Sequence, residues 1–121
     1  MYELMTKQFS KWIVKQTITQ DGLTEALTEI SLGQFEANLG AGLYKKCIRF
    51  EGQGKSGSGR TIICYKKDDR AIFIHGFAKN EKSNLTKKEL KAFKEFSKIL
   101  LGLTEKQIEV AIENGDFIEV E

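Results

Sequence analysis

A glycine-rich stretch at residues 52–60, GQGKSGSGR, has the residue types that bind phosphate. It combines four glycines and two serines with the cations Lys55 and Arg60. Backbone N–H groups of a glycine turn, flanked by fixed cations, form a concavity that binds a phosphate group. We therefore expect this region to bind a phosphodiester that belongs to a longer polymer. Three further cations come just before it: Lys45, Lys46 and Arg49.

The same stretch matches one nucleotide-binding motif in full and a second one in part, but neither match lies in the structural context that its motif requires. Gly52, Gly54 and Gly57 match G-x-G-x-x-G, but that motif leads directly into a helix and is followed by an acidic residue about 20 positions later. Here a strand-like sequence follows, and position 77 is a phenylalanine. A P-loop requires a glycine at position 49, which is Arg49. The sequence therefore argues against a nucleotide cofactor.

The charge distribution also favours a polyanionic partner. The net charge is only +2, but residues 1–44 carry −2, 45–70 carry +5, 79–98 carry +4 and 99–121 carry −5. A concentrated positive field raises the local concentration of nucleic acid. For residues 87–98 alone, a solvated lysine-rich helix face explains the charge equally well.

The length and composition indicate one domain, residues 1–121, of an ordinary globular protein. No apolar run reaches the roughly 18 residues of a membrane span, and the N-terminus lacks the apolar core of a signal peptide, so we expect a cytoplasmic protein without a membrane partner. Cys47 and Cys64 are expected to be free thiols. With His75 as the single histidine, no zinc site is expected, and we predict no metal or other cofactor.

The residue patterns predict an α+β fold with two N-terminal helices, an antiparallel sheet of three to four strands and two C-terminal helices. The helices carry local start signals: Thr6 as an N-cap, and capping boxes at Thr86 with Glu89 and at Thr104 with Gln107. Two nearly continuous apolar runs, at residues 60–67 and 71–78, predict a central β-hairpin with helices over at least one of its faces. The expected parts are a helical hairpin at 1–40 with an apolar stripe at Leu23, Ala26, Leu27 and Ile30, a sheet at 43–78 containing the loop 52–60, and C-terminal helices with a short edge strand at 86–121.

Three motifs in this order resemble one protein family. The chain reads GAGLYKKC at residues 40–47, GKSGSGR at 54–60 and FAKNE at 77–81. This succession resembles the RelE/HigB-like toxins of bacterial type II toxin–antitoxin systems, within the RelE/ParE superfamily, in a branch with G-x-G-L-Y-K-x-R, G-K-S-G-G-[YF]-R and F-A-K-N-E. The terminal helices resemble that branch too, so the similarity covers nearly the whole chain.

The resemblance implies a microbial-RNase-like fold and a ribosome-dependent, metal-independent endoribonuclease, an mRNA interferase that inhibits translation. In that reaction the ribose 2′-hydroxyl attacks its own phosphate and leaves a cyclic phosphate and a 5′-hydroxyl. The expected partners are the ribosome, messenger RNA and a cognate antitoxin with a helix-turn-helix DNA-binding domain. Carried over by motif, the catalytic residues are Arg60, which clamps the phosphate, with Lys55, Lys79 and Lys46, and the RNA-binding residues are Lys45, Arg49, Asn80 and Lys82.

Two further residues are candidates for the general base. His75 has the ordinary pKa of a proton-transfer group, near 6.5, but it lies within an apolar strand sequence, which equally suits a supporting role in the core. Glu81 in FAKNE is the second candidate, and a salt bridge to a nearby lysine explains it as well.

The chain departs from the branch at two positions. Cys47 stands where the branch has an arginine, and Gly59 stands where it has an aromatic residue before Arg60. The first removes a cation and the second removes a ring that stacks on a base. Two alternatives therefore stay open: an RNA- or ribosome-binding protein that has lost catalysis, and an inhibitor of DNA gyrase like the related ParE proteins.

Overall fold

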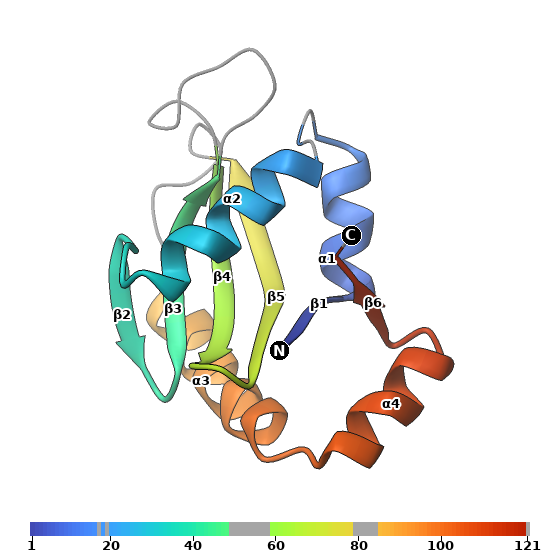
Figure 1. Ribbon diagram of the computed structural model, residues 1–121. Coiled ribbons are helices and arrows are strands. Elements are labelled where there is room, and N and C mark those ends of the chain that lie inside the picture. Colours follow the sequence, from blue (N-terminus) through green and yellow to red (C-terminus); the bar gives the residue numbers. More distant parts are fainter. Residues whose placement is uncertain (17, 19, 49–58, 79–84, 121) are drawn as a thin grey trace.

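The computed structural model describes residues 1–121 apart from positions 17, 19, 49–58, 79–84 and 121 (Figure 1). Within the described residues the chain forms six strands and four helices. In chain order they are β1 (Tyr2–Thr6), α1 (Lys7–Val14), α2 (Gln20–Ser31), β2 (Ala37–Gly40), β3 (Leu43–Ile48), β4 (Gly59–Lys66), β5 (Arg70–Ala78), α3 (Lys87–Leu101), α4 (Glu105–Glu113) and β6 (Phe117–Glu119).

The sheet is larger than the sequence predicted. The described strands lie in the order β2-β3-β4-β5-β1-β6. β1 pairs with β5 in parallel, whereas the other neighbouring pairs are antiparallel. The α+β class is confirmed, but the expectation of three to four strands, all antiparallel, is wrong: the sheet is mixed and has six.

The two strands missing from the prediction are β1 and β2. β1 lies inside the sheet, and its consecutive residues Leu4 and Met5 are buried in the two cores on opposite faces. Five residues are too few for a clear alternation, and Thr6 ends this strand while it caps the next helix. β2 has only four residues, of which Gly40 has a positive φ. The terminal edge strand expected from the sequence is confirmed as β6.

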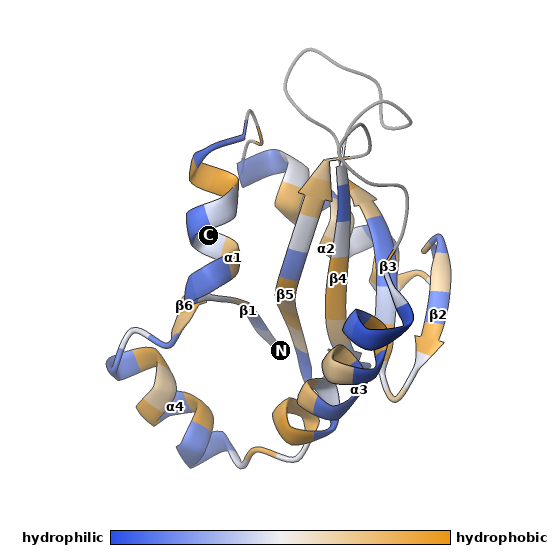
Figure 2. Ribbon diagram, turned by 180° about the vertical axis from the view of Figure 1, so that it is seen from behind, coloured by the Kyte–Doolittle hydropathy of each residue, from blue (hydrophilic) through white to orange (hydrophobic). Residues whose placement is uncertain are grey.

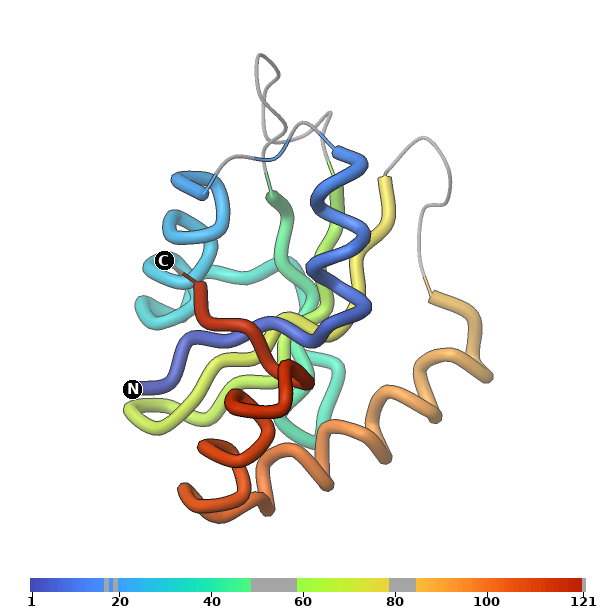
Figure 3. Tube along the Cα trace, turned by 90° about the vertical axis from the view of Figure 1, so that its right-hand side faces the viewer, coloured from blue at the N-terminus to red at the C-terminus, as the bar shows by residue number. Residues whose placement is uncertain are grey.

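Helices cover both faces of this sheet (Figures 1 and 3). On one face, called the α1/α2 face, Ile63 and Phe73 pack with Phe9 of α1 and the stripe of α2. On the other, called the α3/α4 face, Ile62 and Ile72 pack with α3 and α4. The predicted burial of the stripe of α2 is confirmed at all four positions: Leu23, Ala26, Leu27 and Ile30.

The predicted helix starts are confirmed by their hydrogen bonds. Thr6 Oγ1 accepts from the backbone N–H of Phe9 at 3.1 Å. Both capping boxes form in full, with Thr86 paired to Glu89 and Thr104 paired to Gln107. These signals act within one helical turn, which is why the sequence alone reveals them.

The turn between β2 and β3 is held beneath α3. Gly40, Ala41 and Gly42 all have positive φ values, of 91°, 57° and 75°. Ser97 Oγ of α3 donates a hydrogen bond to the carbonyl oxygen of Ala41 at 2.8 Å. A Cβ atom at Gly42 would lie 2.3 Å from Leu101 Cδ1. The two glycines of GAGLY therefore allow a left-handed turn to approach α3 closely.

Replacing Gly42 with alanine should lower the free energy of unfolding by about 2–3 kcal/mol, because left-handed strain and overpacking against Leu101 add. Gly33→Ala is the matched control, since Gly33 has a φ of 80° but nothing within 4 Å of the added Cβ. The control should lose only the strain, about 1–2 kcal/mol. Chemical denaturation measures both, and equal losses would contradict the close packing.

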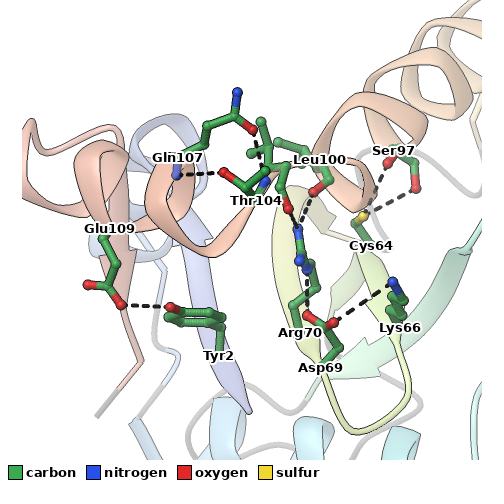
Figure 4. Close-up of polar contacts among 11 residues, drawn as sticks. Tyr2, Cys64, Lys66, Asp69, Arg70, Ser97, Leu100, Thr104, Gln107 and Glu109 are labelled. Atoms are coloured by element: carbon green, nitrogen blue, oxygen red, sulfur yellow. Dashed lines mark hydrogen bonds and ion pairs between the residues drawn. The ribbon is translucent and has the colours of Figure 1, made fainter.

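Polar contacts tie α3 to the β4–β5 hairpin (Figure 4). Arg70 is 4 % exposed, and its Nη1 donates to the carbonyl oxygens of Leu100 and Leu103 at 2.9 and 2.7 Å. These acceptors stand at the C-terminal end of α3, where a cation is favoured. Ser97 Oγ lies 3.2 Å from the buried Cys64 Sγ. The contacts of Arg70 and of Ser97 with Cys64 therefore fix the C-terminal end of α3 to the sheet.

Stability should fall at alkaline pH because of Cys64. Burial raises the pKa of its thiol to about 11, while an unfolded thiol titrates near 8.5. Because the folded pKa is the higher one, this contribution is complete below about pH 8.5 and is lost as the pH rises toward 11, by about 2–3 kcal/mol. Denaturation at pH 8 and pH 10.5 measures the loss. Cys64→Ala should show a shallower decline, and parallel curves would refute the assignment.

Candidate active site

Two cross-strand rows on the α3/α4 face bring together four of the residues singled out in the sequence. In the first row Lys45 of β3 pairs with Ile62 of β4, which pairs with His75 of β5. In the second row Cys47 pairs with Arg60, which pairs with Phe77. Partners in neighbouring strands share a face and lie about 5 Å apart. We call these two rows the Arg60 surface.

The Arg60 surface lies at the end of the sheet where the described part of the chain is interrupted. The next row is Ile48, Gly59 and Ala78, so segments 49–58 and 79–84 both join the sheet here. Helix α3 packs mainly nearer the opposite end of the sheet (Figure 2), and its Phe93 reaches the Arg60 surface at the ring of His75. Six predicted site residues lie outside the described residues: Arg49, Lys55, Lys79, Asn80, Glu81 and Lys82.

Arg60 has the most unusual environment on this surface. The side chain is partly buried, and its Nη1 atom is buried without a hydrogen-bond partner among the residues that the structure describes. A buried guanidinium donor without an acceptor costs free energy, and such groups in folded proteins call for a functional explanation. An anion that approaches Arg60 would satisfy this donor.

Cys47 lies directly across from Arg60. At the position of Cys47, the branch that this chain resembles has an arginine. The residue is buried, with 7 % of its surface exposed. Burial raises the pKa of this thiol, the neighbouring carboxylate of Glu36 raises it further, and the charge of Arg60 opposes both. Glu36 also accepts a hydrogen bond from the backbone N–H of Cys47. The thiol therefore stays protonated at neutral pH and supplies neither a cation nor a nucleophile.

Lys46 lies on the opposite face of the sheet from Arg60. It pairs with Thr61, and its Nζ atom lies 2.6 Å from Glu29 Oε1 of α2 and 3.9 Å from Glu36 Oε1. Its side chain is 3 % exposed. The structure therefore separates Lys46 from the predicted site residues that it describes on the Arg60 surface, and a phosphate on that surface is beyond its reach. Its neighbour Lys45 is the one that faces the α3/α4 side.

His75 contributes an aromatic ring to the Arg60 surface. The ring is half-buried, with its centroid 4.9 Å from that of Phe93 of α3 and 6.0 Å from that of Phe77. It also borders a cavity of about 120 Å³ beside Trp12 of α1. His75 thus has both a packed side and an accessible one, which is compatible with either role expected for it.

Gly59 begins β4 and is buried in the row next to Arg60. Since side chains alternate along a strand, a residue at position 59 would point to the α1/α2 face, away from Arg60. An aromatic residue here would pack toward α2, so the missing ring changes the packing behind the site.

Sequence reasoning missed three residues that shape the site: Glu29, Glu36 and Phe93. Glu29 and Glu36 hold Lys46 and the backbone of β3, and Phe93 supports the ring of His75. Helical periodicity does not say which ring Phe93 of α3 meets. The two carboxylates carry no local signal, because their partner is on a distant strand.

No helix in the described part of the chain is both long and apolar enough to cross a bilayer.

Comparison with known proteins shows the family of the chain. No curated protein matches the chain. The family model described as the RelE toxin of the RelE/RelB toxin–antitoxin system matches residues 1–120, which includes every strand of the sheet and all the residues of the Arg60 surface. The chain therefore belongs to the family of RelE toxins of RelE/RelB toxin–antitoxin systems.

Proposed function

We propose that this RelE-family toxin is an endoribonuclease that cleaves messenger RNA on the ribosome, with Arg60 as its phosphate clamp. Membership of the family supports a toxin role and implies a cognate antitoxin. The finer assignment, to the branch with the GKSGxxR and FAKNE motifs, rests on the sequence. The observation that carries the proposal is the buried Nη1 atom of Arg60, which has no partner among the described residues.

In the proposed reaction the ribose 2′-oxygen forms a bond to the adjacent phosphorus while the bond from phosphorus to the 5′-oxygen breaks. A general base takes the proton of the 2′-hydroxyl, and a general acid gives a proton to the departing 5′-oxygen. Negative charge gathers on the non-bridging oxygens in between. Arg60 stabilises that charge from a partly buried position, where such an interaction is stronger than in water.

Other residues complete this site in the proposal. Lys45 shares the α3/α4 face with Arg60 and binds a flanking phosphate. Lys55 and Lys79 add cations beside the scissile phosphate, and Arg49, Asn80 and Lys82 bind the flanking strand; these five roles rest on the sequence motifs. Lys46 acts indirectly, because its ion pair with Glu29 fixes β3 to α2.

The general base has two candidates: His75 on the Arg60 surface and Glu81 from FAKNE. A pH–rate profile for wild type and His75→Gln separates them. If His75 is the base, the substitution removes the acid limb of the profile. If it only packs against Phe93, the profile keeps its shape.

The test is to express the chain in bacteria and map the ends of cellular messages by primer extension. We expect growth arrest and new ends within translated messages, whose downstream fragments carry 5′-hydroxyls and so require phosphorylation before ligation. Co-expression of the antitoxin should relieve the arrest. Normal growth with intact ribosome-bound messages would refute the proposal.

Two other outcomes identify the alternatives. Arrest of translation with intact messages would point to an RNA-binding protein without catalysis, and the protonated thiol of Cys47 across from Arg60 is the observation in its favour. Loss of gyrase supercoiling activity in the presence of the purified chain would point instead to a ParE-like inhibitor.

A further inference from the structure

Helix α3 carries four lysines in a straight line along one side, which we call the lysine file. Lys87, Lys91, Lys94 and Lys98 follow the spacing i, i+4, i+7 and i+11, which places all four on one side of a helix. Three of them are exposed and Lys94 is partly exposed. At 1.5 Å per residue the file is about 16 Å long. It therefore spans several successive phosphates of a nucleic-acid strand.

These lysines have no acidic partners within the described chain. The ion pairs found there involve Lys46, Lys66 and Arg70, and none involves the file. A solvated helix face commonly places Glu and Lys four residues apart to form weak pairs. Glu95 stands four residues after Lys91 without pairing to it. Among the described residues no ion pair neutralises the positive charge of the file, so an external anion can bind there.

The file lies on the side of α3 that faces the edge of the sheet. The Nζ atom of Lys94 lies 3.5 Å from the place of a Cβ atom at Gly40 of β2. Lys45 of the neighbouring strand β3 faces the same side of the sheet, as do Arg60 and the ring of His75, which packs on Phe93 of α3. The file and the Arg60 surface are therefore parts of one positively charged side of the molecule.

The exposed apolar residues of α3 lie on another side of the helix. Phe96 is 38 % exposed and Ile99 is 63 % exposed, and their positions in the helical repeat differ from those of the file by about 80° or more. A protein–protein interface needs an apolar centre, whereas the hollow along the file is lined by its four lysines together with Leu90 and Glu95. Four evenly spaced cations beside one apolar residue suit a phosphate backbone, whose contacts come mainly from lysine, arginine and polar groups.

We propose that the lysine file of α3 is a second RNA-binding surface, which holds the phosphodiester backbone of folded RNA outside the strand that is cleaved. The inference deepens the proposed function and rests on it, because it gives the toxin a way to bind structured RNA while Arg60 engages the scissile phosphate. The contacts are electrostatic and independent of base sequence.

The test compares two triple variants with equal change in charge. One carries K87Q, K91Q and K98Q. The other carries K7Q and K11Q on α1 and K15Q at its C-cap, three lysines that are also exposed but belong to the other face. Fluorescence anisotropy with a labelled, 2′-O-methylated RNA hairpin measures binding from 50 to 200 mM salt. The α3 variant should bind at least about tenfold more weakly at low salt. For this variant the slope of log K against log salt concentration should become less negative by roughly 0.9 for each phosphate contact that is lost.

The remaining outcomes all count against the proposal. Equal losses in the two triples would show a general charge effect, and unchanged binding in the α3 triple would remove the file from RNA recognition. Unchanged RNA binding with weaker binding of the antitoxin would assign the file to a protein partner. Thermal unfolding checks that both variants fold, and the single variant K91Q repeats the measurement with minimal change.

This test is separate from that of the proposed function. The hairpin cannot be cleaved, so binding is measured whether or not the chain is a nuclease. If the wild type binds the hairpin through α3 but leaves messages intact on ribosomes, the proposed cleavage fails and the RNA-binding surface stands.

Discussion

Replacing Arg60 with methionine should lower the rate of message cleavage on ribosomes by about 10²–10³-fold, the usual loss when one donor to a developing anionic charge is removed. It should leave the free energy of unfolding within about 1 kcal/mol of wild type, because the buried Nη1 atom has no partner to lose among the described residues. Primer extension with purified ribosomes measures the first quantity, and chemical denaturation measures the second.

Arg70→Met is the matched control. Arg70 is also buried, but its Nη1 atom donates to two backbone carbonyls. The substitution should cost about 2–4 kcal/mol of stability, while cleavage per folded molecule stays close to wild type. Arg60→Met that cleaves normally would exclude Arg60 as the clamp. A large loss of stability in Arg60→Met would show that the guanidinium is structural.

Replacing Lys46 with methionine should destabilise the protein by about 2–4 kcal/mol, since removal of one member of a buried ion pair leaves the other without compensation. The lower end of that range reflects the 21 % exposure of Glu29, which allows water to reach the remaining carboxylate. Cleavage should fall only as far as the folded fraction falls, because Lys46 faces away from Arg60.

A double variant separates these effects. Glu29→Gln alone leaves the Lys46 ammonium buried, with Glu36 at 3.9 Å as its remaining carboxylate, and should also be destabilising. Combining it with Lys46→Met removes both charges and should recover about 1–2 kcal/mol of the lost stability. If Lys46→Met instead folds normally and loses cleavage, the lysine acts on the substrate and the indirect role proposed for it is wrong.

The helices and the candidate site residue Arg60 could be predicted from the sequence, because the signals for them are local. A threonine cap with a glutamate or glutamine three residues later acts within one turn, so both capping boxes are found where the letters place them. The apolar stripe of α2 follows directly from the helical repeat. The motif that ends at Arg60 directed attention to a residue whose buried Nη1 atom has no hydrogen-bond partner within the described part of the chain.

The strands were harder to predict from the sequence, because a strand forms only by pairing with neighbouring strands. β1 is inserted between β5 and the C-terminal strand β6, more than a hundred residues away in the chain. Nothing within YELMT indicates these neighbours. The turn GAG similarly reads as a flexible connection, and only the position of α3 shows why Gly42 has no room for a side chain.

The roles of the adjacent cations Lys45 and Lys46 show where local information ends. Strand alternation alone implies that the two side chains point to opposite faces. It does not say which face a helix covers, nor that α2 brings Glu29 to meet Lys46 while Lys45 faces the side of Arg60. Residue types and spacing predicted a basic strand and loop that bind phosphate. The packing of distant helices on the two faces of the sheet decided that Lys46 is buried against Glu29 while Lys45 stays on the side of Arg60, because burial and ion pairing depend on contacts between segments far apart in the chain.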